Sequence, residues 1–172
     1  GIVVTNTQSA AISESVAEFT WAFILGVSRR IIEGDEFGRK GAYRGWEPDL
    51  FLGRAVYDKT LGIIGLGRIG AIVARRARGF NMKVLYNKRE RDEKLERELG
   101  IEFVGLDTLL TQADFVTLHV PLTPETRHLI GGEELVKMKQ TAFLINTARG
   151  GVVDEHALVS ALKKGVIAGV GL

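Results

Sequence analysis

A glycine-rich hexapeptide constrains the fold of this chain more than any other feature. Gly65–Gly70 (GLGRIG) follows the apolar run Leu61–Ile64 and opens a helical pattern, the setting in which GxGxxG marks a dinucleotide-binding turn. Gly65 permits the tight turn, Gly67 lets the backbone approach a pyrophosphate, and Gly70 allows the helix to pack closely on the strand. The first N–H groups of that helix then face the phosphates.

The rest of the chain alternates between predicted strands and predicted helices. Strands are expected at 60–65, 83–87, 102–104, 114–120, 141–146 and 166–170, and helices at 68–80, 93–99, 106–112, 133–138 and 154–164. The strands are mostly continuous apolar runs, as in strands buried on both faces. The alternation predicts an α/β fold of the Rossmann-like kind, a three-layer doubly wound parallel sheet.

The N-terminal third has a different pattern. Gly1–Thr5 is predicted to be a strand and Ser9–Gly34 a long helix, with Ser15 and Glu18 at capping-box spacing and Gly34 as its stop. The helix has a broad apolar surface, which suits either a core helix or a subunit interface. Asp35–Asp58 has no clear period, and we interpret it as a long ordered loop with short helical pieces that makes contacts.

Composition excludes several classes of protein. The 172 residues suit one domain, and without cysteine no disulfide, thiolate metal site or cysteine nucleophile is possible. With 23 basic and 21 acidic side chains the net charge is +2, which argues against a general nucleic-acid or membrane-surface binder. No histidines and carboxylates have metal-ligand spacing. These features favour a cytoplasmic protein without a metal.

The residues after the second predicted strand of the sheet bear on cofactor choice. Sites selective for NAD have a carboxylate there, on the ribose hydroxyls. Here the strand ends at Asn87 and continues with Lys88 and Arg89, and the first carboxylate is Glu90. Two cations attract a 2′-phosphate, so the sequence favours NADP(H) over NAD(H). The alternative is that both are solvated charges in a run of mixed sign.

Two further segments follow strands and therefore lie at the same predicted edge of the sheet. In Asn146–Gly151 (NTARGG) an arginine, Arg149, stands among small residues and can grip a carboxylate with two parallel hydrogen bonds. A plain surface arginine is the alternative. Val120 and Pro121 are candidates to flank a ring, whereas His119 is expected to be packed or hydrogen-bonded. The remaining histidines, at 128 and 156, are expected to be structural or solvent-facing.

Five stretches together carry a resemblance to a known family. They are TLGIIGLGRIG at 60–70, HVPLT at 119–123, TRHLI at 126–130, NTARGG at 146–151 and AGVGL at 168–172. In this order and spacing they resemble the D-isomer-specific 2-hydroxyacid dehydrogenases, with greatest similarity to the glyoxylate/hydroxypyruvate reductase and phosphoglycerate dehydrogenase branches. The resemblance implies two Rossmann-like domains, of which residues 1–172 look like the dinucleotide-binding domain, excised from its substrate domain.

The resemblance also implies roles for individual residues. Leu66, Gly67, Arg68 and Ile69 would bind the pyrophosphate, and Lys88 stands where NAD-using members have Asp. Val120 and Pro121 would line the adenine or ribose side, and Thr126 belongs to the same cofactor-binding segment. Thr147, Ala148 and Arg149 would lie near the nicotinamide. Arg149 would be the catalytic arginine that binds the substrate.

The implied reaction is hydride transfer between NAD(P)H and a 2-keto acid such as glyoxylate, hydroxypyruvate or a phosphoglycerate-type acid. The family's catalytic Glu and His are expected beyond Leu172, so we expect the chain alone to be inactive. The long helix and the loop after it are expected to pair two copies into a homodimer. The alternative is a nucleotide-sensing co-repressor, which uses the same scaffold for protein interaction.

Overall fold

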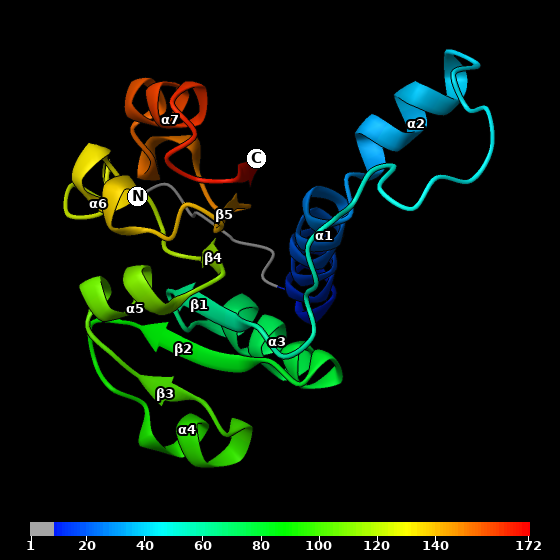
Figure 1. The fold of residues 1–172 in the computed structure, drawn as a ribbon. Helices are drawn as coiled ribbons and strands as arrows, with labels where there is room; N and C mark the ends of the chain where they lie inside the picture. The colour runs from blue at the N-terminus through cyan, green and yellow to red at the C-terminus, as the bar shows by residue number, and fades with distance from the viewer. Residues whose placement is uncertain (1–8) are drawn as a thin grey trace, which may run out of the picture.

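A single parallel sheet organises the part of the protein that the structure describes, residues 9–172 of a computed structural model (Figure 1). Its strand order is β3-β2-β1-β4-β5-β6, with every neighbouring pair parallel. The strands are β1 (Thr60–Ile64), β2 (Lys83–Asn87), β3 (Glu102–Phe103), β4 (Phe115–Leu118), β5 (Phe143–Asn146) and β6 (Gly169–Gly171). The predicted doubly wound parallel fold is confirmed. The strand predicted at Gly1–Thr5 lies outside the described residues.

Helices cover both faces of the sheet. They are α1 (Ala10–Ser28), α2 (Ile31–Arg39), α3 (Arg68–Ala77), α4 (Glu93–Leu99), α5 (Leu106–Gln112), α6 (Gly132–Lys137) and α7 (Glu155–Lys163). One core cluster joins the sheet to α1, α3 and α4, and a second joins it to α5, α6 and α7. Within β1, Ile63 belongs to the first cluster and Ile64 to the second. The apolar runs of β1, β4 and β5 are therefore continuous because these strands are buried on both faces.

Most predicted boundaries hold to within a few residues, and the differences have local causes. The predicted strand 114–120 is shortened to β4, Phe115–Leu118. Before it, the Asp114 carboxylate accepts hydrogen bonds from the Thr60 N–H (2.9 Å) and Lys139 Nζ (2.8 Å). The strand predicted at 166–170 begins only at Gly169. Gly165 has φ +64°, and the Val166 N–H bonds to Ala161 O, so these residues end α7.

The helix predicted at Ser9–Gly34 is confirmed as far as Ser28, but its continuity to Gly34 is wrong, because the helix breaks at Arg29 and Arg30. Ser9, not Ser15, is the N-cap of α1 and accepts the Ile12 N–H at 3.2 Å. Arg30 has φ +55°, and α2 then continues through Gly34 without stopping. The Arg30 guanidinium binds Glu33 and lies 5.0 Å from the centre of the Phe51 ring, contacts that hold the left-handed turn.

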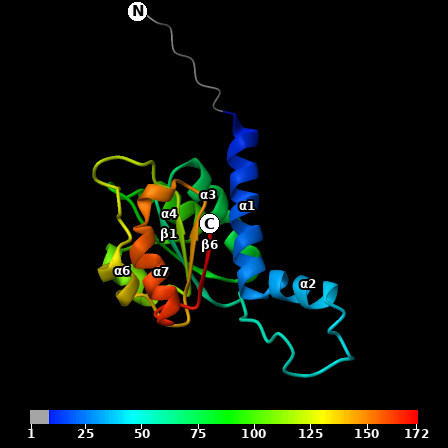
Figure 2. The ribbon, with the colours of Figure 1, turned by 90° about the horizontal axis from the view of Figure 1, so that it is seen from above.

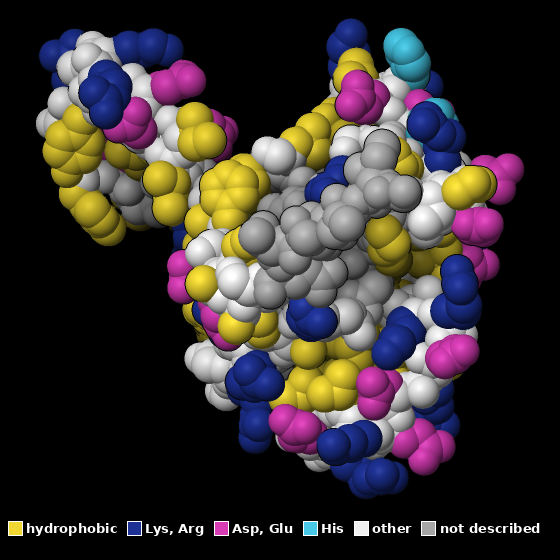
Figure 3. Space-filling view, turned by 180° about the vertical axis from the view of Figure 1, so that it is seen from behind, with side chains coloured by type: hydrophobic (Ala, Val, Ile, Leu, Met, Phe, Trp, Pro, Cys, Tyr) yellow, Lys and Arg dark blue, Asp and Glu magenta, His cyan; other side chains and the backbone are white. Residues whose placement is uncertain are grey.

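Residues 29–52, which we call the arm, project from the body of the domain (Figures 1 and 2). The chain then returns beside the end of α1, where the Arg54 N–H bonds to Ser28 O at 2.7 Å. Figure 3 shows hydrophobic side chains on the arm, and Trp46 is 82% exposed. Helix α1 itself is long and apolar enough to cross a membrane by length and composition alone, a test that core helices of soluble proteins also pass.

Candidate functional site

The glycine turn lies at the carboxyl edge of the sheet, between the ends of β2 and β4. The Gly65 N–H donates to Asn87 O at 2.9 Å, and the His119 N–H donates to Ile64 O at 2.8 Å. Gly65 has φ +98°, and a Cβ there would lie 2.8 Å from the His119 carbonyl carbon. A Cβ on Gly70 would collide with Gly65 O. These two glycines therefore serve the turn and the close packing of α3.

Gly67 differs from Gly65 and Gly70, because a Cβ there would meet no atom of residues 9–172 within 4 Å. It is the N-cap of α3, with extended backbone (φ −91°, ψ −158°), and as a glycine it has no side chain that could cap the helix. An open space above a helix N-terminus suits an anionic group such as a pyrophosphate. Leu66 is buried in the core, so it can contribute only backbone atoms to such a site.

The segment with two cations, residues 87–89, lies beside the glycine turn. Asn87, at the end of β2, is held by its Nδ2, which donates to Val104 O at 2.9 Å. Lys88 Nζ lies 3.4 Å from Asp92 Oδ2, whereas Arg89 is exposed. A hydrogen bond from Thr123 lowers the pKa of Glu125, and the charge of Arg89 lowers it further. The charge of Arg89 therefore acts on the loop after β4.

The loop after β4 is shaped by Thr126. Its hydroxyl donates to Pro121 O at 2.6 Å and accepts the Thr123 N–H at 2.8 Å. Val120 is half-buried against the glycine turn, with Pro121 exposed beside it. His119 is packed, as predicted. Its Nε2 is buried without a hydrogen bond in the described part of the chain, and burial lowers its pKa to about 4, which keeps it neutral.

The loop after β5 is pinned by Asn146. Its Oδ1 accepts the Ala148 N–H and its Nδ2 donates to Arg149 O, both at 3.0 Å. Thr147 Oγ1 lies 2.9 Å from Thr20 Oγ1 of α1. Because the single Thr20 proton is donated to Val16 O, Thr147 is the donor in this pair. The loop is thus fixed from both sides, and α1 is tied to it.

Arg149 is exposed at the mouth of a cavity. Its Nη1 donates to Ala148 O at 2.8 Å. The cavity measures about 270 Å³, and its lining includes Thr147, Arg149, Glu155 and Leu172. A second hollow of about 380 Å³ opens between Thr147 and α1. The arrangement can hold a small anion beside whatever occupies the edge of the sheet.

The structure brings the sequence-predicted candidates together along one edge, and it adds residues that sequence reasoning did not single out. Thr20 and Asn146 fix the arginine loop; Asn146 was visible within NTARGG, but nothing in the sequence linked Thr20 to residue 147. His128 and His156 are exposed, as expected. In residues 9–172 no three His, Cys, Asp or Glu side chains are grouped to hold a metal ion.

This edge, with a glycine turn at a helix N-terminus and three loops around it, belongs to a nucleotide-binding α/β domain of the Rossmann type. The chain belongs to the D-isomer specific 2-hydroxyacid dehydrogenases, whose NAD binding domain model matches residues 21–172.

Relatives of known kind agree with this assignment. The chain is 53% identical to the glyoxylate reductases of Korarchaeum cryptofilum and Pyrococcus horikoshii, covering all of this chain and 52% of each relative. A solved structure from Thermus thermophilus matches with TM-score 0.93 at 45% identity, covering 100% of this chain and 53% of that one. The chain thus spans about half the length of these relatives. Their names give no support to the co-repressor alternative.

A D-lactate dehydrogenase from Aquifex aeolicus, solved with NAD and lactic acid, is also similar. Its TM-score is 0.87 at 42% identity, and the match covers 93% of this chain and 47% of that one.

Proposed function

We propose that residues 1–172 form one dinucleotide-binding domain that binds NADP(H) in preference to NAD(H) and presents it to a 2-keto acid held by Arg149. One observation carries the proposal: the glycine turn, the Lys88–Arg89 pair and the Arg149 loop lie along the same edge of the sheet. Ligands of open α/β sheets bind at this edge, where the strand order reverses. Here the reversal falls between β1 and β4.

Different residues of this edge bind different parts of the cofactor. The N–H groups at the start of α3, from Gly67 to Gly70, receive the pyrophosphate. Lys88 and Arg89, next to Asn87, receive the 2′-phosphate. Val120 and Pro121 flank the adenine or ribose, in a loop whose shape Thr126 maintains. Thr147 and Ala148 border the nicotinamide. When bound, the cofactor supplies or accepts the hydride.

Arg149 acts on the substrate. An exposed guanidinium forms two parallel hydrogen bonds to a carboxylate, and its positive charge also favours negative charge developing on a neighbouring carbonyl oxygen. Proton transfer to that oxygen needs a general acid, typically worth 10²–10⁴-fold in rate. The groups expected to do this, a Glu and a His, are not among the motifs of this chain. We therefore expect the 172-residue chain to bind nucleotide without reducing glyoxylate, and robust NADPH-dependent reduction by it would refute this.

Calorimetric titration with NADPH and NADH side by side tests the cofactor choice. Structures similar to this chain include an acyclic imino acid reductase in complex with NADPH and D-Arg as well as the NAD-bound lactate dehydrogenase. These structures therefore do not distinguish NADP(H) from NAD(H) as the cofactor of this chain. The proposal predicts tighter NADPH binding that is abolished by Lys88→Asp combined with Arg89→Ala. Equal or tighter NADH binding would contradict it.

Glyoxylate is the substrate to test first, because the relatives above are glyoxylate reductases. Hydroxypyruvate, phosphohydroxypyruvate and pyruvate are the natural comparisons. The assay is NADPH oxidation by the protein joined to a substrate domain. A higher kcat/KM for glyoxylate than for the bulkier acids supports this choice, and a preference for one of them contradicts it.

Two copies are proposed to pair through α1 and the arm. Phe19 is 57% exposed on α1, and an apolar groove of about 490 Å³ runs between α1 and β6. Exposed apolar surface of this extent marks interaction sites. Light scattering at tens of micromolar is expected to give twice the chain mass of 18.8 kDa, and a monomeric mass would contradict the pairing.

The proposal also includes a cytoplasmic location, with neither nucleic acid nor a membrane as partner.

A further inference from the structure

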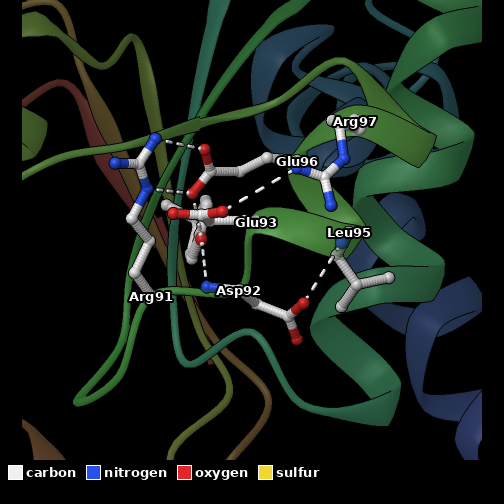
Figure 4. A network of polar contacts seen from close by, with 7 residues as sticks. Arg91, Asp92, Glu93, Leu95, Glu96 and Arg97 are labelled. Atoms are coloured by element: carbon white, nitrogen blue, oxygen red, sulfur yellow. Dashed lines mark hydrogen bonds and ion pairs between the residues drawn. The ribbon is translucent and has the colours of Figure 1, made fainter.

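A polar network joins the end of β2, the loop at 88–92 and α4 (Figure 4). Its centre is Tyr86, which is fully buried, with its ring 5.4 Å from that of Phe103 on β3. The Tyr86 hydroxyl donates to Glu96 Oε1 at 2.7 Å and accepts the Asp92 N–H at 2.9 Å. One buried phenol thus holds both the loop and the helix after it.

Arg91 completes the network from the outer side. Its Nε and Nη2 each donate to a different oxygen of Glu96, both at 2.8 Å. The guanidinium of Arg91, together with the Tyr86 hydroxyl, lowers the pKa of Glu96 to about 2, so the carboxylate is charged at neutral pH. Planar two-pronged pairs of this kind fix both orientation and distance. Arg91 is thereby turned toward α4.

The loop is also anchored where it begins and along its length. Asn87 is bound through its side chain to Val104 O and through its carbonyl to the Gly65 N–H. Asp92 Oδ1 accepts the Leu95 N–H at 3.1 Å and caps α4, while its Oδ2 lies 3.4 Å from Lys88. Four residues, 88–91, lie between the anchors Asn87 and Asp92, and those at the tip, Arg89 and Glu90, are exposed.

The path of this loop determines which charged side chains lie near the ribose of the cofactor. Lys88 and Arg89 are followed within four residues by carboxylates at Glu90, Asp92 and Glu93. A fixed loop presents the two cations to the ribose and loses less conformational entropy when the cofactor binds. A loop free to rearrange would also bring the carboxylates toward the 2′ position, where they repel a phosphate but accept hydrogen bonds from a plain ribose.

We propose that Tyr86, Arg91 and Glu96 are positioning residues for cofactor choice, which fix the loop so that Lys88 and Arg89 face the 2′-phosphate. This inference rests on the proposed preference for NADP(H). It adds three residues that touch no part of the nucleotide and act through the two cations.

Dissociation constants of NADPH and NADH, measured by calorimetry for Tyr86→Phe, Glu96→Gln and Arg91→Ala, test the inference. Each variant is expected to weaken NADPH binding roughly tenfold and to change NADH binding less than about twofold, because only the phosphate depends on the loop. Arg91→Lys, which keeps the charge but not the two-pronged geometry, is expected to fall in between. Circular dichroism checks that each variant is folded. If Tyr86→Phe unfolds, Arg91→Ala tests the same network, because Arg91 is exposed and its replacement leaves the core intact.

Arg97→Ala is the matched control. Arg97 lies on the same short helix and pairs only loosely with Glu93, at 3.7 Å, so both dissociation constants should stay unchanged. An equal loss of NADPH and NADH affinity in the network variants, or an unchanged ratio, would overturn the inference alone. If the unaltered protein shows no preference for NADPH, the proposed cofactor choice fails, and the inference fails with it.

Discussion

Replacing Gly67 with alanine separates the binding role of the glycine turn from its role in folding. The backbone of Gly67 is extended, a conformation that alanine adopts, and the added Cβ would meet nothing within 4 Å in the described part of the chain. Alanine is a poorer N-cap than glycine but reduces the entropy of the unfolded chain. These opposing effects are each about 0.5–1 kcal/mol, so the free energy of unfolding should change by less than about 1 kcal/mol.

The effect on the nucleotide should be much larger. A methyl group in the open space above α3 displaces a pyrophosphate from the N–H groups of the turn. Loss of two hydrogen bonds to a charged group, at about 1.5 kcal/mol each, costs about 3 kcal/mol, or roughly a hundredfold in the dissociation constant. Calorimetric titration with NADPH measures this loss, and urea unfolding measures stability.

Gly105 provides the matched control for this experiment. It is likewise an extended glycine N-cap, of α5, and an added Cβ would have no described residue within 4 Å. Gly105→Ala should leave NADPH binding unchanged. A folded Gly67→Ala protein that binds NADPH within about threefold of the unaltered protein would refute the reasoning, because the open space would then not hold the pyrophosphate.

Three further predictions follow from contacts around the same edge. Gly70→Ala should destabilise the fold by about 1–3 kcal/mol in urea unfolding, because its Cβ collides with Gly65 O; unchanged stability would mean that the turn relaxes at no cost. Thr20→Val should cost about 1 kcal/mol by removing the acceptor of the Thr147 hydroxyl, and Thr20→Ser should restore it; equal stability of the two variants would contradict this assignment. Since burial lowers the pKa of His119 from 6.5 to about 4, the unfolded chain takes up the proton first, and stability should fall as pH drops from about 6.5 to 4. That decline, about 3 kcal/mol by order of magnitude, should disappear in His119→Gln, and NMR titration of His119 near pH 6.5 would contradict it.

The sheet could be predicted from sequence because its signals are local. Continuous apolar runs such as Thr60–Ile64 are separated by helical patterns, and Gly65 has a left-handed backbone conformation (φ +98°) that few other residues adopt. The break between α1 and α2 could not be predicted. Arg30 adopts φ +55° without a glycine or asparagine to mark it, and the contacts that hold it, with Glu33 and Phe51, arise only in the folded arm.

The candidate site, like the fold, could be predicted only in part. Motifs predicted which loops lie at the carboxyl edge, since the ends of parallel strands meet there. They did not predict what fixes those loops. Thr20 and Thr147 are 127 residues apart in the chain, and the phenol of Tyr86 reads in sequence as one more apolar strand residue. Contacts of this kind depend on packing between elements, which no local pattern encodes.

Amide chemical shifts during titration with NADPH are the most direct test of whether a dinucleotide binds at the carboxyl edge of the sheet. Binding there should give the largest changes at Gly65–Gly70, Lys88 and Ala148, with little change at the opposite edge. That edge has its own cavity of about 290 Å³, whose lining includes Lys59 and Thr141. Changes concentrated there, or none anywhere at saturating nucleotide, would contradict the account.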